Sequence, residues 1–546
     1  MDSYTAQTGE TLRSVAYRMR LDIQKLLSLN PHIPNPDTYI AGQTVNLVRM
    51  IHIPIAAPQP PETDLKQWIP LTSLEEMSQT EYDVLIVGAG AGGPAVLWRL
   101  CQQWGLNGKR IGIVERGDLL IPTHSMNIPT LNASRKRDFY KNISYPLGKS
   151  QPEYPGASQV FALGGKTLFW STASPRMHPA DFNEWPISYE ELTPYYNIAE
   201  RVMNISKGYT QDSTITTMML EILRGSGFPE ITELPTAIDL TATKFGQVHS
   251  NALFSSIAFL GSALNQRPFD LAVNARAVQI LSENGNATGL RVMSPDKKSY
   301  VIKAKTIVVS ASTWETPRLL LSSGIPGKAI GHYLMNHSKI VATVKIDRSY
   351  FPEVLGTLFI WKPRTLIEPY QMILYGPDLE RYLWYPVFEN KEVLKEFDIG
   401  IETLGVVEPQ FENYIALNHA SVDAYGVPDI QVRFSYSEKD KAIIGKMLQA
   451  TNHMVASLLG TIGAKNRQPE LSFYVPGEDY HEMGSYRMGN DPSTSATNPY
   501  GRIHGISNLY VADNSVIPYS GAANPTLTTV ALAIRTTDHI IHQLSK

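Results

Sequence analysis

Cysteine is almost absent from this chain, since Cys101 is the single one among 546 residues. One cysteine excludes an internal disulfide and a metal centre built from thiolates, and we expect no metal site. An excess of one charge is also lacking, because 48 lysines and arginines stand against 51 aspartates and glutamates. This balance gives no electrostatic reason to expect nucleic acid as a partner.

Long apolar runs and a basic leader are lacking too. No uninterrupted apolar stretch approaches the roughly 18–20 residues that a membrane-spanning helix needs. Residues 1–5 do not resemble the start of a secretory signal. We therefore expect a cytoplasmic protein without a membrane span. With 43% hydrophobic and 18% charged residues, the composition is typical of a globular protein.

Residues 4–47 have the pattern of a small βααβ unit. The expected elements are a strand at 4–6, a helix from about 12, a second helix that ends at 30 before a proline, and a strand at 44–47. This segment resembles the lysin-motif (LysM) domain in the stretches TAQTGETL, LLSLNP and AGQTVNL. The resemblance implies a ligand that contains N-acetylglucosamine. A docking module for a protein partner is the alternative.

Residues 51–80 differ in composition from what precedes them. Prolines at 54, 58, 60, 61 and 70 disfavour regular structure and favour an extended spacer or a strap on the next domain. We therefore expect a LysM-like domain at 1–50, a proline-rich linker at 51–80 and a catalytic region at 81–546.

A dinucleotide-binding pattern opens this last region. Residues 82–87 read as a strand buried on both faces, and Gly88, Gly90 and Gly93 follow it in the GxGxxG spacing before a helical segment. The first glycine permits a tight turn, the second admits pyrophosphate, and the third lets the helix pack on the strand. Glu115, 22 residues past Gly93, ends a second strand and can accept hydrogen bonds from a ribose. The pattern does not separate FAD from NAD.

A second strand-to-helix junction lies near the C-terminus. Residues 508–513 read as a buried strand that ends in Asp513, and Asn524 with Pro525 have the pattern of an N-cap and a first helical residue. The N–H groups of this helix would stabilise the negative charge of a reduced flavin. An ordinary capped helix is the alternative.

Together these segments resemble the glucose–methanol–choline (GMC) family of FAD oxidoreductases over about residues 81–546, and most closely its sugar-oxidising branch with the pyranose oxidases. The matching motifs are GAGAGG at 88–93, GGKTLFW at 164–170, WPISY at 185–189, ETPRLL at 315–320 and HEMGSYRMG at 481–489. The resemblance implies an α/β fold, with a Rossmann-like FAD-binding domain and a discontinuous antiparallel-sheet substrate domain. We expect FAD-binding segments at about 81–165, 240–345 and 475–546, and substrate-domain segments at about 166–239 and 346–474.

The resemblance also implies which residues bind the cofactor. The ADP half of FAD would be held by Gly88, Gly90, Gly93 and Glu115. The pyrophosphate or isoalloxazine would lie against Gly164 and Gly165. Asp513 would meet the ribityl and phosphate region, and the pyrimidine edge would lie beside Thr526 and Leu527. Phe169 stands where some pyranose oxidases carry a histidine bonded to FAD, so non-covalent FAD is expected. Ser312 stands where many relatives have a glycine, which puts the local backbone geometry in question.

The same resemblance implies the oxidation of an alcohol, with His481 as the catalytic base. A histidine suits this role because its pKa is near neutrality. Asn524, 43 positions on, matches the family's second catalytic position and would hold the substrate oxygen. We interpret His337 and His504 as structural.

The resemblance leaves the substrate and the electron acceptor open. A secondary hydroxyl of a sugar or glycoside is the first expectation, and a hydrophobic alcohol such as a sterol or polyketide is the alternative. The aromatic-rich stretch 350–385 does not separate them. The electron acceptor is O2 or a quinone. A glycan-binding or scaffold protein with a silent flavin domain is the alternative from a different class.

Overall fold

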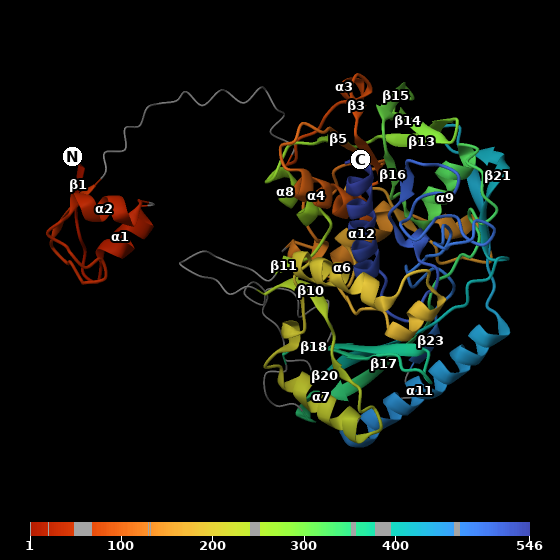
Figure 1. Cartoon of the computed structure of the whole chain (residues 1–546). Helices are drawn as coiled ribbons and strands as arrows, with labels where there is room; N and C mark the ends of the chain where they lie inside the picture. Colours follow the sequence, from red (N-terminus) through yellow and green to blue (C-terminus); the bar gives the residue numbers. More distant parts are fainter. Residues whose placement is uncertain are drawn as a thin grey trace. The chain divides into compact units, whose positions relative to one another are not determined.

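The computed structural model of the chain describes residues 2–19, 21–47, 68–128, 130–131, 133–240, 252–350, 356–376, 395–462 and 470–545. The chain forms two compact units, Met1–Ile69 and Pro70–Lys546. Figure 1 shows both, coloured along the sequence. Most of the expected linker, residues 51–67, lies outside the described residues, and the predicted domain boundaries stay predictions.

The N-terminal unit has the βααβ fold that the sequence predicts. Strand β1 (Asp2–Thr5) pairs antiparallel with β2 (Thr44–Leu47), and helices α1 (Leu12–Arg18) and α2 (Ile23–Leu29) lie between them in sequence. Each helix begins with a capping side chain, because Thr11 and Asp22 accept hydrogen bonds from backbone N–H groups of the first turn. The buried side chains of this unit include Leu12, Val15, Leu26 and Val45.

A five-stranded parallel sheet forms the centre of the larger unit. Its strands, from edge to edge, are β12 (Asp270–Ala272), β5 (Ile111–Val114), β4 (Val84–Val87), β16 (Ile307–Val309) and β24 (Leu509–Val511). Helix α4 (Gly92–Trp104) follows β4 and packs against α8 (Ile257–Leu264) and against α12 (Thr526–Leu544), which is the dark blue helix in Figure 1. This arrangement confirms the Rossmann-like fold.

Smaller elements flank this sheet. A second sheet has the order β13 (Arg276–Glu283), β14 (Asn286–Met293), β15 (Ser299–Ala304) and β3 (Glu81–Tyr82). The hairpin β21 (Tyr414–Val422) and β22 (Pro428–Arg433) packs on α9 (Ser312–Ser322). Helix α6 (Tyr189–Val202) packs on α12, and the short helix α3 (Leu74–Ser78) packs on β15.

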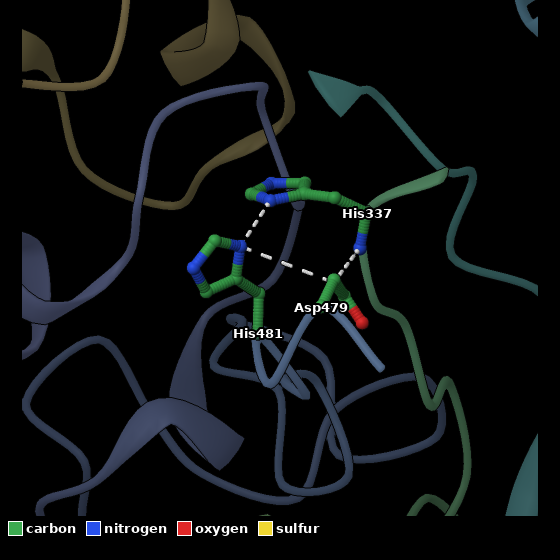
Figure 2. Close-up of side chains that lie close together, drawn as sticks. All are labelled: His337, Asp479 and His481. Carbon is green, nitrogen blue, oxygen red and sulfur yellow. Dashed lines mark hydrogen bonds and ion pairs between the residues drawn. The ribbon is translucent and has the colours of Figure 1, made fainter. Parts of the chain in front are cut away.

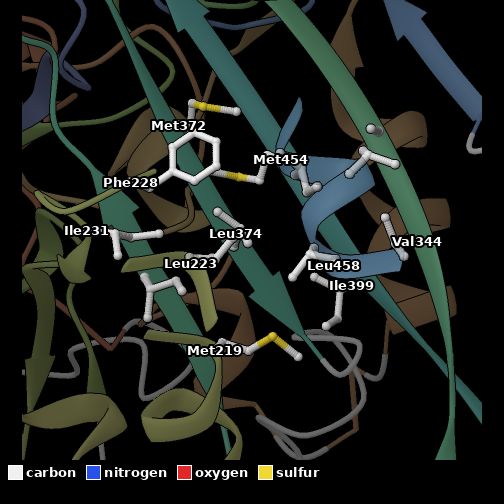
Figure 3. Packing of buried hydrophobic residues seen from close by; sticks show 14 of the residues in the cluster. Met219, Leu223, Phe228, Ile231, Val344, Met372, Leu374, Ile399, Met454 and Leu458 are labelled. Atoms are coloured by element: carbon white, nitrogen blue, oxygen red, sulfur yellow. The ribbon is translucent and has the colours of Figure 1, made fainter. Parts of the chain in front are cut away.

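A six-stranded antiparallel sheet forms the other part of the larger unit. Its order is β23 (Glu470–Phe473), β17 (Ser338–Asp347), β20 (Glu396–Gly405), β19 (Tyr370–Gly376), β18 (Leu358–Lys362) and β9 (Thr232–Glu233). One face packs on helices α7 (Thr214–Gly225) and α11 (Glu438–Ile462), and Figure 3 shows the core between them, with Met219, Leu374 and Leu458 among the buried side chains. This sheet confirms the expected antiparallel substrate domain.

The two faces of this antiparallel sheet differ in character. On the helix-packed face β17 places Ile340 and Ala342, and β20 places Ile401. Because successive side chains of a strand point to opposite faces, Lys339 and Glu402 lie on the other face. Where the structure describes the chain, no helix is both long and apolar enough to cross a membrane.

Candidate active site

A cavity of about 680 Å³ lies where segments of the two large sheets meet. It is lined by the loop after β4, by residues of β17 and β20 and by the 479–482 segment. Eight of the eleven predicted site residues line it, namely Gly88, Gly90, Glu115, Gly165, His481, Asp513, Asn524 and Thr526. Gly93, Gly164 and Leu527 are not among the lining residues.

The glycines of the loop after β4 have the geometry that their spacing predicts. Gly88 has a φ of +99°, and a Cβ there would lie 2.3 Å from the carbonyl oxygen of Ser310. A Cβ on Gly93 would lie 2.0 Å from the Gly88 oxygen, so this glycine permits the close approach of α4 to the loop. A Cβ on Gly90 would meet nothing within 4 Å. The backbone of Gly90 is therefore open to the cavity and can be approached by a ligand.

The two predicted acids both bind the protein's own backbone. Glu115 accepts 2.8 Å hydrogen bonds from the N–H groups of Ala89 and Gly117, and burial raises the pKa of its carboxyl. Asp513 accepts hydrogen bonds from Thr316 Oγ1 at 2.6 Å and from the N–H groups of Ser312 and Ser515, each at 3.0 Å. Burial raises the pKa of Asp513 as well. Each acid ties the end of a parallel strand to a neighbouring loop at the cavity wall.

Ser312, the residue in place of the family's glycine, adopts a backbone conformation that favours glycine. Its φ is +83°, in a region that costs other residues about 1–2 kcal/mol. Two hydrogen bonds hold it there, because its N–H donates to Asp513 and its Oγ accepts from Gln159 Nε2 at 2.7 Å. The glycine-like turn is therefore kept without glycine.

His481 and Asn524 meet in the cavity. Asn524 Nδ2 lies 3.3 Å from His481 Nε2, and the His481 side chain is 18% exposed. Asn524 was predicted to cap the last helix, and this prediction is wrong. Helix α12 begins at Thr526 with Pro525 at the N-cap and no side-chain cap. The Asn524 amide instead takes part in a hydrogen-bond chain with the antiparallel sheet.

That chain fixes which end of the Asn524 amide faces His481. The indole N–H of Trp361 can only donate, and it lies 2.8 Å from Gln371 Oε1. Gln371 therefore presents its NH₂ group to Asn524 Oδ1, at 3.0 Å. Asn524 in turn presents its NH₂ group to His481, so His481 Nε2 is an acceptor.

A second chain reaches the same conclusion from the opposite side of the His481 ring (Figure 2). The carbonyl oxygen of Ser520 can only accept, and it lies 3.3 Å from His337 Nε2, which therefore carries a proton. Burial lowers the pKa of His337 to about 4, so the ring is neutral and its Nδ1 is an acceptor. His481 Nδ1 lies 3.0 Å from this atom and must donate to it. The His481 proton is thus on Nδ1, and the lone pair of Nε2 accepts from Asn524.

The charges around this ring favour its neutral form. Burial, with His337 and the ammonium groups of Lys339 and Lys166 as lesser causes, lowers the pKa of His481 well below its usual value. Burial and the nearby Glu482 raise the pKa of Asp479 to about 7. At neutral pH His481 is therefore an uncharged acceptor, as a catalytic base must be.

Three of these groups also have a spacing that could suit a metal ion. The ligand atoms of His337, Asp479 and His481 lie within 4.8 Å of one another. Asp479, however, accepts hydrogen bonds from the His337 N–H at 2.8 Å and from Asn336 Nδ2 at 3.3 Å. The two ring nitrogens share a hydrogen bond, so hydrogen bonding alone accounts for the arrangement.

Sequence reasoning missed several residues of this site. His337 was interpreted as structural, yet its ring contacts His481. Gln371 and Asp479 were not singled out, and Trp361 was noted only as one aromatic residue of the stretch 350–385. His504, also interpreted as structural, lies 3.0 Å from Ser495 Oγ and is not among the residues that line the cavity. Of the aromatic-rich stretch 350–385, residues 351–355 and 377–385 lie outside the described residues.

Comparisons with known proteins identify the family. Two models of GMC oxidoreductases match residues 82–339 and 409–533, and the LysM domain model matches residues 4–47. The chain therefore belongs to the GMC oxidoreductase family and carries a LysM domain before the catalytic region. Members of this family are FAD enzymes that oxidise CH–OH groups, and this protein is such an oxidoreductase.

Among curated relatives, 2-methyl-1,2-propanediol dehydrogenase of Mycolicibacterium austroafricanum is 26% identical, with 86% of this chain and 96% of the relative covered. Paromamine 6'-oxidase of Streptomyces fradiae is also 26% identical, over 83% of this chain and 90% of its own. C-glycoside 3-oxidases and pyranose 2-oxidases match as well, which places sugar oxidases among the relatives. Formate oxidase of Aspergillus oryzae has the same fold, with a TM-score of 0.64 and 14% identity over 85% of this chain and 99% of its own.

The described residues fit FAD, the cofactor of this family. Gly90 leaves its backbone open to the cavity, and a Cβ on Gly165 would lie 3.4 Å from the Gly90 Cα. Two glycines, Gly90 and Gly165, thus face each other where a pyrophosphate must approach the backbone.

Proposed function

We propose that this protein oxidises a secondary hydroxyl of a sugar or glycoside to a ketone, with His481 as the base and Asn524 as the group that holds the substrate oxygen. The observation that carries the proposal is the agreement of two hydrogen-bond chains. One begins at the Trp361 indole and the other at the Ser520 carbonyl, and both require a lone pair on His481 Nε2.

In this mechanism the substrate hydroxyl lies beside the Asn524–His481 pair, within reach of both side chains, and replaces the hydrogen bond that joins them. The Asn524 NH₂ group donates to the substrate oxygen, and His481 Nε2 accepts the hydroxyl proton as the C–H bond breaks. The Gly88–Gly93 loop, Gly164, Gly165 and the start of α12 would hold FAD, which would supply the hydride acceptor. When His481 takes the proton, its Nδ1–H remains bonded to His337, which keeps the ring in place.

The names of the relatives support a sugar or glycoside as the substrate. Paromamine 6'-oxidase, C-glycoside 3-oxidases and pyranose 2-oxidases act on such compounds by name. The name of 2-methyl-1,2-propanediol dehydrogenase, another relative, supports the alternative that the substrate is an alcohol other than a sugar. Both oxidases and dehydrogenases match, so O2 and a quinone remain alternative electron acceptors. Non-covalent attachment of FAD and a cytoplasmic location stay predictions.

The LysM domain supports a second, independent binding function. We propose that it binds a glycan that contains N-acetylglucosamine, as the resemblance implies. Two large aromatic side chains, Tyr17 and Tyr39, are 56% and 73% exposed in this unit and offer flat surfaces to a sugar ring. Retention of the full-length protein on insoluble chitin tests this role, and a Y39A variant retained equally well would exclude Tyr39 from it.

An anaerobic flavin-reduction experiment tests the catalytic proposal. The purified protein is mixed with D-glucose, methyl β-D-glucopyranoside, an aryl C-glucoside or cholesterol, and loss of flavin absorbance is followed. We expect a sugar or glycoside to reduce the flavin, and H481A to slow that reduction about 10²–10⁴-fold. H504A, which changes a histidine outside the cavity lining, is the matched control. Reduction by cholesterol alone would favour the hydrophobic alternative, and no reduction by any alcohol would favour a silent flavin domain.

A further inference from the structure

The antiparallel sheet carries an ion pair on the face that lines the cavity. Lys339 on β17 and Glu402 on β20 are diagonal neighbours on that face, because Lys339 pairs with Leu404 and Glu402 with Val341 in the strand register. Their charged atoms lie 3.0 Å apart. Both residues line the cavity, as do His481 and Asn524.

This pair is partly removed from water. The Lys339 side chain is 12% exposed and the Glu402 side chain 26%, and an ion pair in such a place is weak evidence for stability, because apolar side chains of similar volume often serve equally well. Leu404 and Ile373, which lie on the same face, belong to an apolar cluster and show that this face accepts such residues. The ion pair therefore calls for a reason other than stability.

The pair lies close to the candidate base. Lys339 comes two residues after His337, whose ring lies 3.0 Å from His481 Nδ1, and Lys339, Asp479 and His481 line the same cavity. The ring of Tyr474 lies under the ammonium, 4.8 Å from Nζ to the ring centroid, and holds it in place. A substrate that meets His481 therefore extends toward an immobilised cation and carboxylate.

We propose that Lys339 and Glu402 form a binding subsite for hydroxyl groups that neighbour the carbon being oxidised. Lys339 Nζ donates to one substrate oxygen, and the Glu402 carboxylate accepts a hydrogen bond from an adjacent hydroxyl. The ligand class is a polyhydroxylated compound with vicinal hydroxyls, as in a sugar ring. This subsite rests on the proposed function, since it assumes that the substrate carbinol lies at His481 and Asn524.

Substitutions that remove the pair test the proposal. A single change to an apolar residue leaves one partly buried charge without a partner and can unfold the protein. The main variant is therefore the double substitution Lys339→Met with Glu402→Leu, and the second is E402Q, which keeps an oxygen that can accept from Lys339. The matched control is K345M with D398N, because Lys345 and Asp398 pair directly on the same two strands but are 50% and 52% exposed. FAD content and the melting temperature are measured for each variant.

The readout compares a diol with a mono-alcohol of similar shape. Anaerobic flavin reduction and perturbation of the flavin spectrum are measured with D-glucose, with trans-cyclohexane-1,2-diol and with cyclohexanol. We expect the double variant and E402Q to lose about 10–100-fold in apparent affinity for glucose and the diol, as befits hydrogen bonds to charged groups. Cyclohexanol should change less than about threefold, and the control variant should behave like the wild type.

Each outcome separates the subsite from the catalytic proposal. Equal losses for the diol and for cyclohexanol, or no loss for either, would overturn the subsite while wild-type reduction still supports the catalysis. If glucose perturbs the wild-type flavin spectrum without reducing it, and the double variant loses this perturbation, the subsite stands and the proposed function fails. If glucose and the diol neither reduce the wild-type flavin nor perturb its spectrum, both the subsite and the proposed function are overturned.

Discussion

His481 Nε2 and Asn524 Nδ2 lie 3.3 Å apart in the lining of the cavity, although Asn524 follows His481 by 43 positions in the chain. Each group is oriented by partners from a different part of the fold. Asn524 is held by Gln371 of the antiparallel sheet, and His481 is held by His337, just before β17. The protonation of the site is therefore decided by residues that need not touch the substrate.

Removal of the acceptor on His337 tests the first of these supports. In H337F, His481 Nδ1 loses its partner and the ring is free to turn or to change its tautomer. We expect flavin reduction to slow by about 10–100-fold, since one oriented hydrogen bond is lost, with FAD content unchanged. H337N should recover part of the rate because its amide oxygen can accept from Nδ1. Equal rates in H337F and the wild type would remove His337 from this positioning role.

Gln371 offers a test of the orientation of Asn524. In Q371E the new carboxylate accepts from Trp361 and also requires a donor from Asn524, which turns the Asn524 oxygen toward His481 Nε2. In Q371L the Asn524 amide loses its partner but is not forced to turn. We therefore predict that flavin is reduced more slowly by Q371E than by Q371L, and by both more slowly than by the wild type. The reverse order of the two variants would contradict the hydrogen-bond chain.

The pH dependence of flavin reduction follows from two groups, one with a lowered and one with a raised pKa. Burial lowers the pKa of His481 well below its usual value, so its base form persists on acidification and the rate falls only well below pH 6.5. Asp479, with a pKa raised to about 7, changes its charge near neutrality. We expect an inflection near pH 7 in the reduction rate of the wild type that is absent in D479N. A profile with the same inflection in D479N would exclude Asp479 as its source.

The same carboxyl predicts a stability effect. The folded state holds the Asp479 proton up to about pH 7, whereas the unfolded state releases it near its ordinary value of 3.8. This group therefore stabilises the fold fully below about pH 4, and its contribution is lost as the pH rises toward 7. The melting temperature of FAD-saturated D479N should decline less over this range than that of the wild type. A larger decline of the melting temperature in D479N than in the wild type would contradict a raised pKa of Asp479 in the folded state.

Ser312 provides a test of backbone strain at the cavity wall. S312A and S312G both lose the hydrogen bond from Gln159, but only glycine relieves the positive φ. This conformation costs residues other than glycine about 1–2 kcal/mol. Part of the advantage of glycine is offset because its unfolded chain has more conformational freedom to lose on folding. We therefore expect S312G to be more stable than S312A by about 1 kcal/mol. Urea unfolding with saturating FAD measures the difference. An S312A variant as stable as S312G would show that the turn is unstrained.

The sequence predicts the nucleotide-binding turn well because its signal is local. Gly88 directly follows the buried strand β4, and a Cβ on Gly93 would meet Gly88 and Ile86, which are near neighbours in the chain. The close contact of Gly88 with Ser310 comes from a distant segment and is not part of this local signal. The residues that orient the site were not predictable in this way. Gln371 and Asn524 are 153 positions apart, and only the strand register and the cavity bring them together.

The N-cap prediction for Asn524 failed for a related reason. The local pattern Asn-Pro favours a capped helix, but the Asn524 amide has two tertiary partners, Gln371 and His481, that the pattern cannot contain. His337 lies in a segment that resembles the family, but it was interpreted as structural because any one histidine is more often structural than catalytic. The family motif predicted His481 and Asn524, whereas the residues that orient them, His337 and Gln371, were identified only from the three-dimensional structure.

The ¹⁵N chemical shifts of the His481 ring in the FAD-bound protein at neutral pH test the central claim most directly. Labelled histidine gives the signals, and comparison with H481A assigns them. The hydrogen-bond chains predict a neutral ring with its proton on Nδ1 and an unprotonated Nε2. A ring protonated on Nε2, or on both nitrogens, would contradict the account, because no lone pair would then face Asn524 and the substrate.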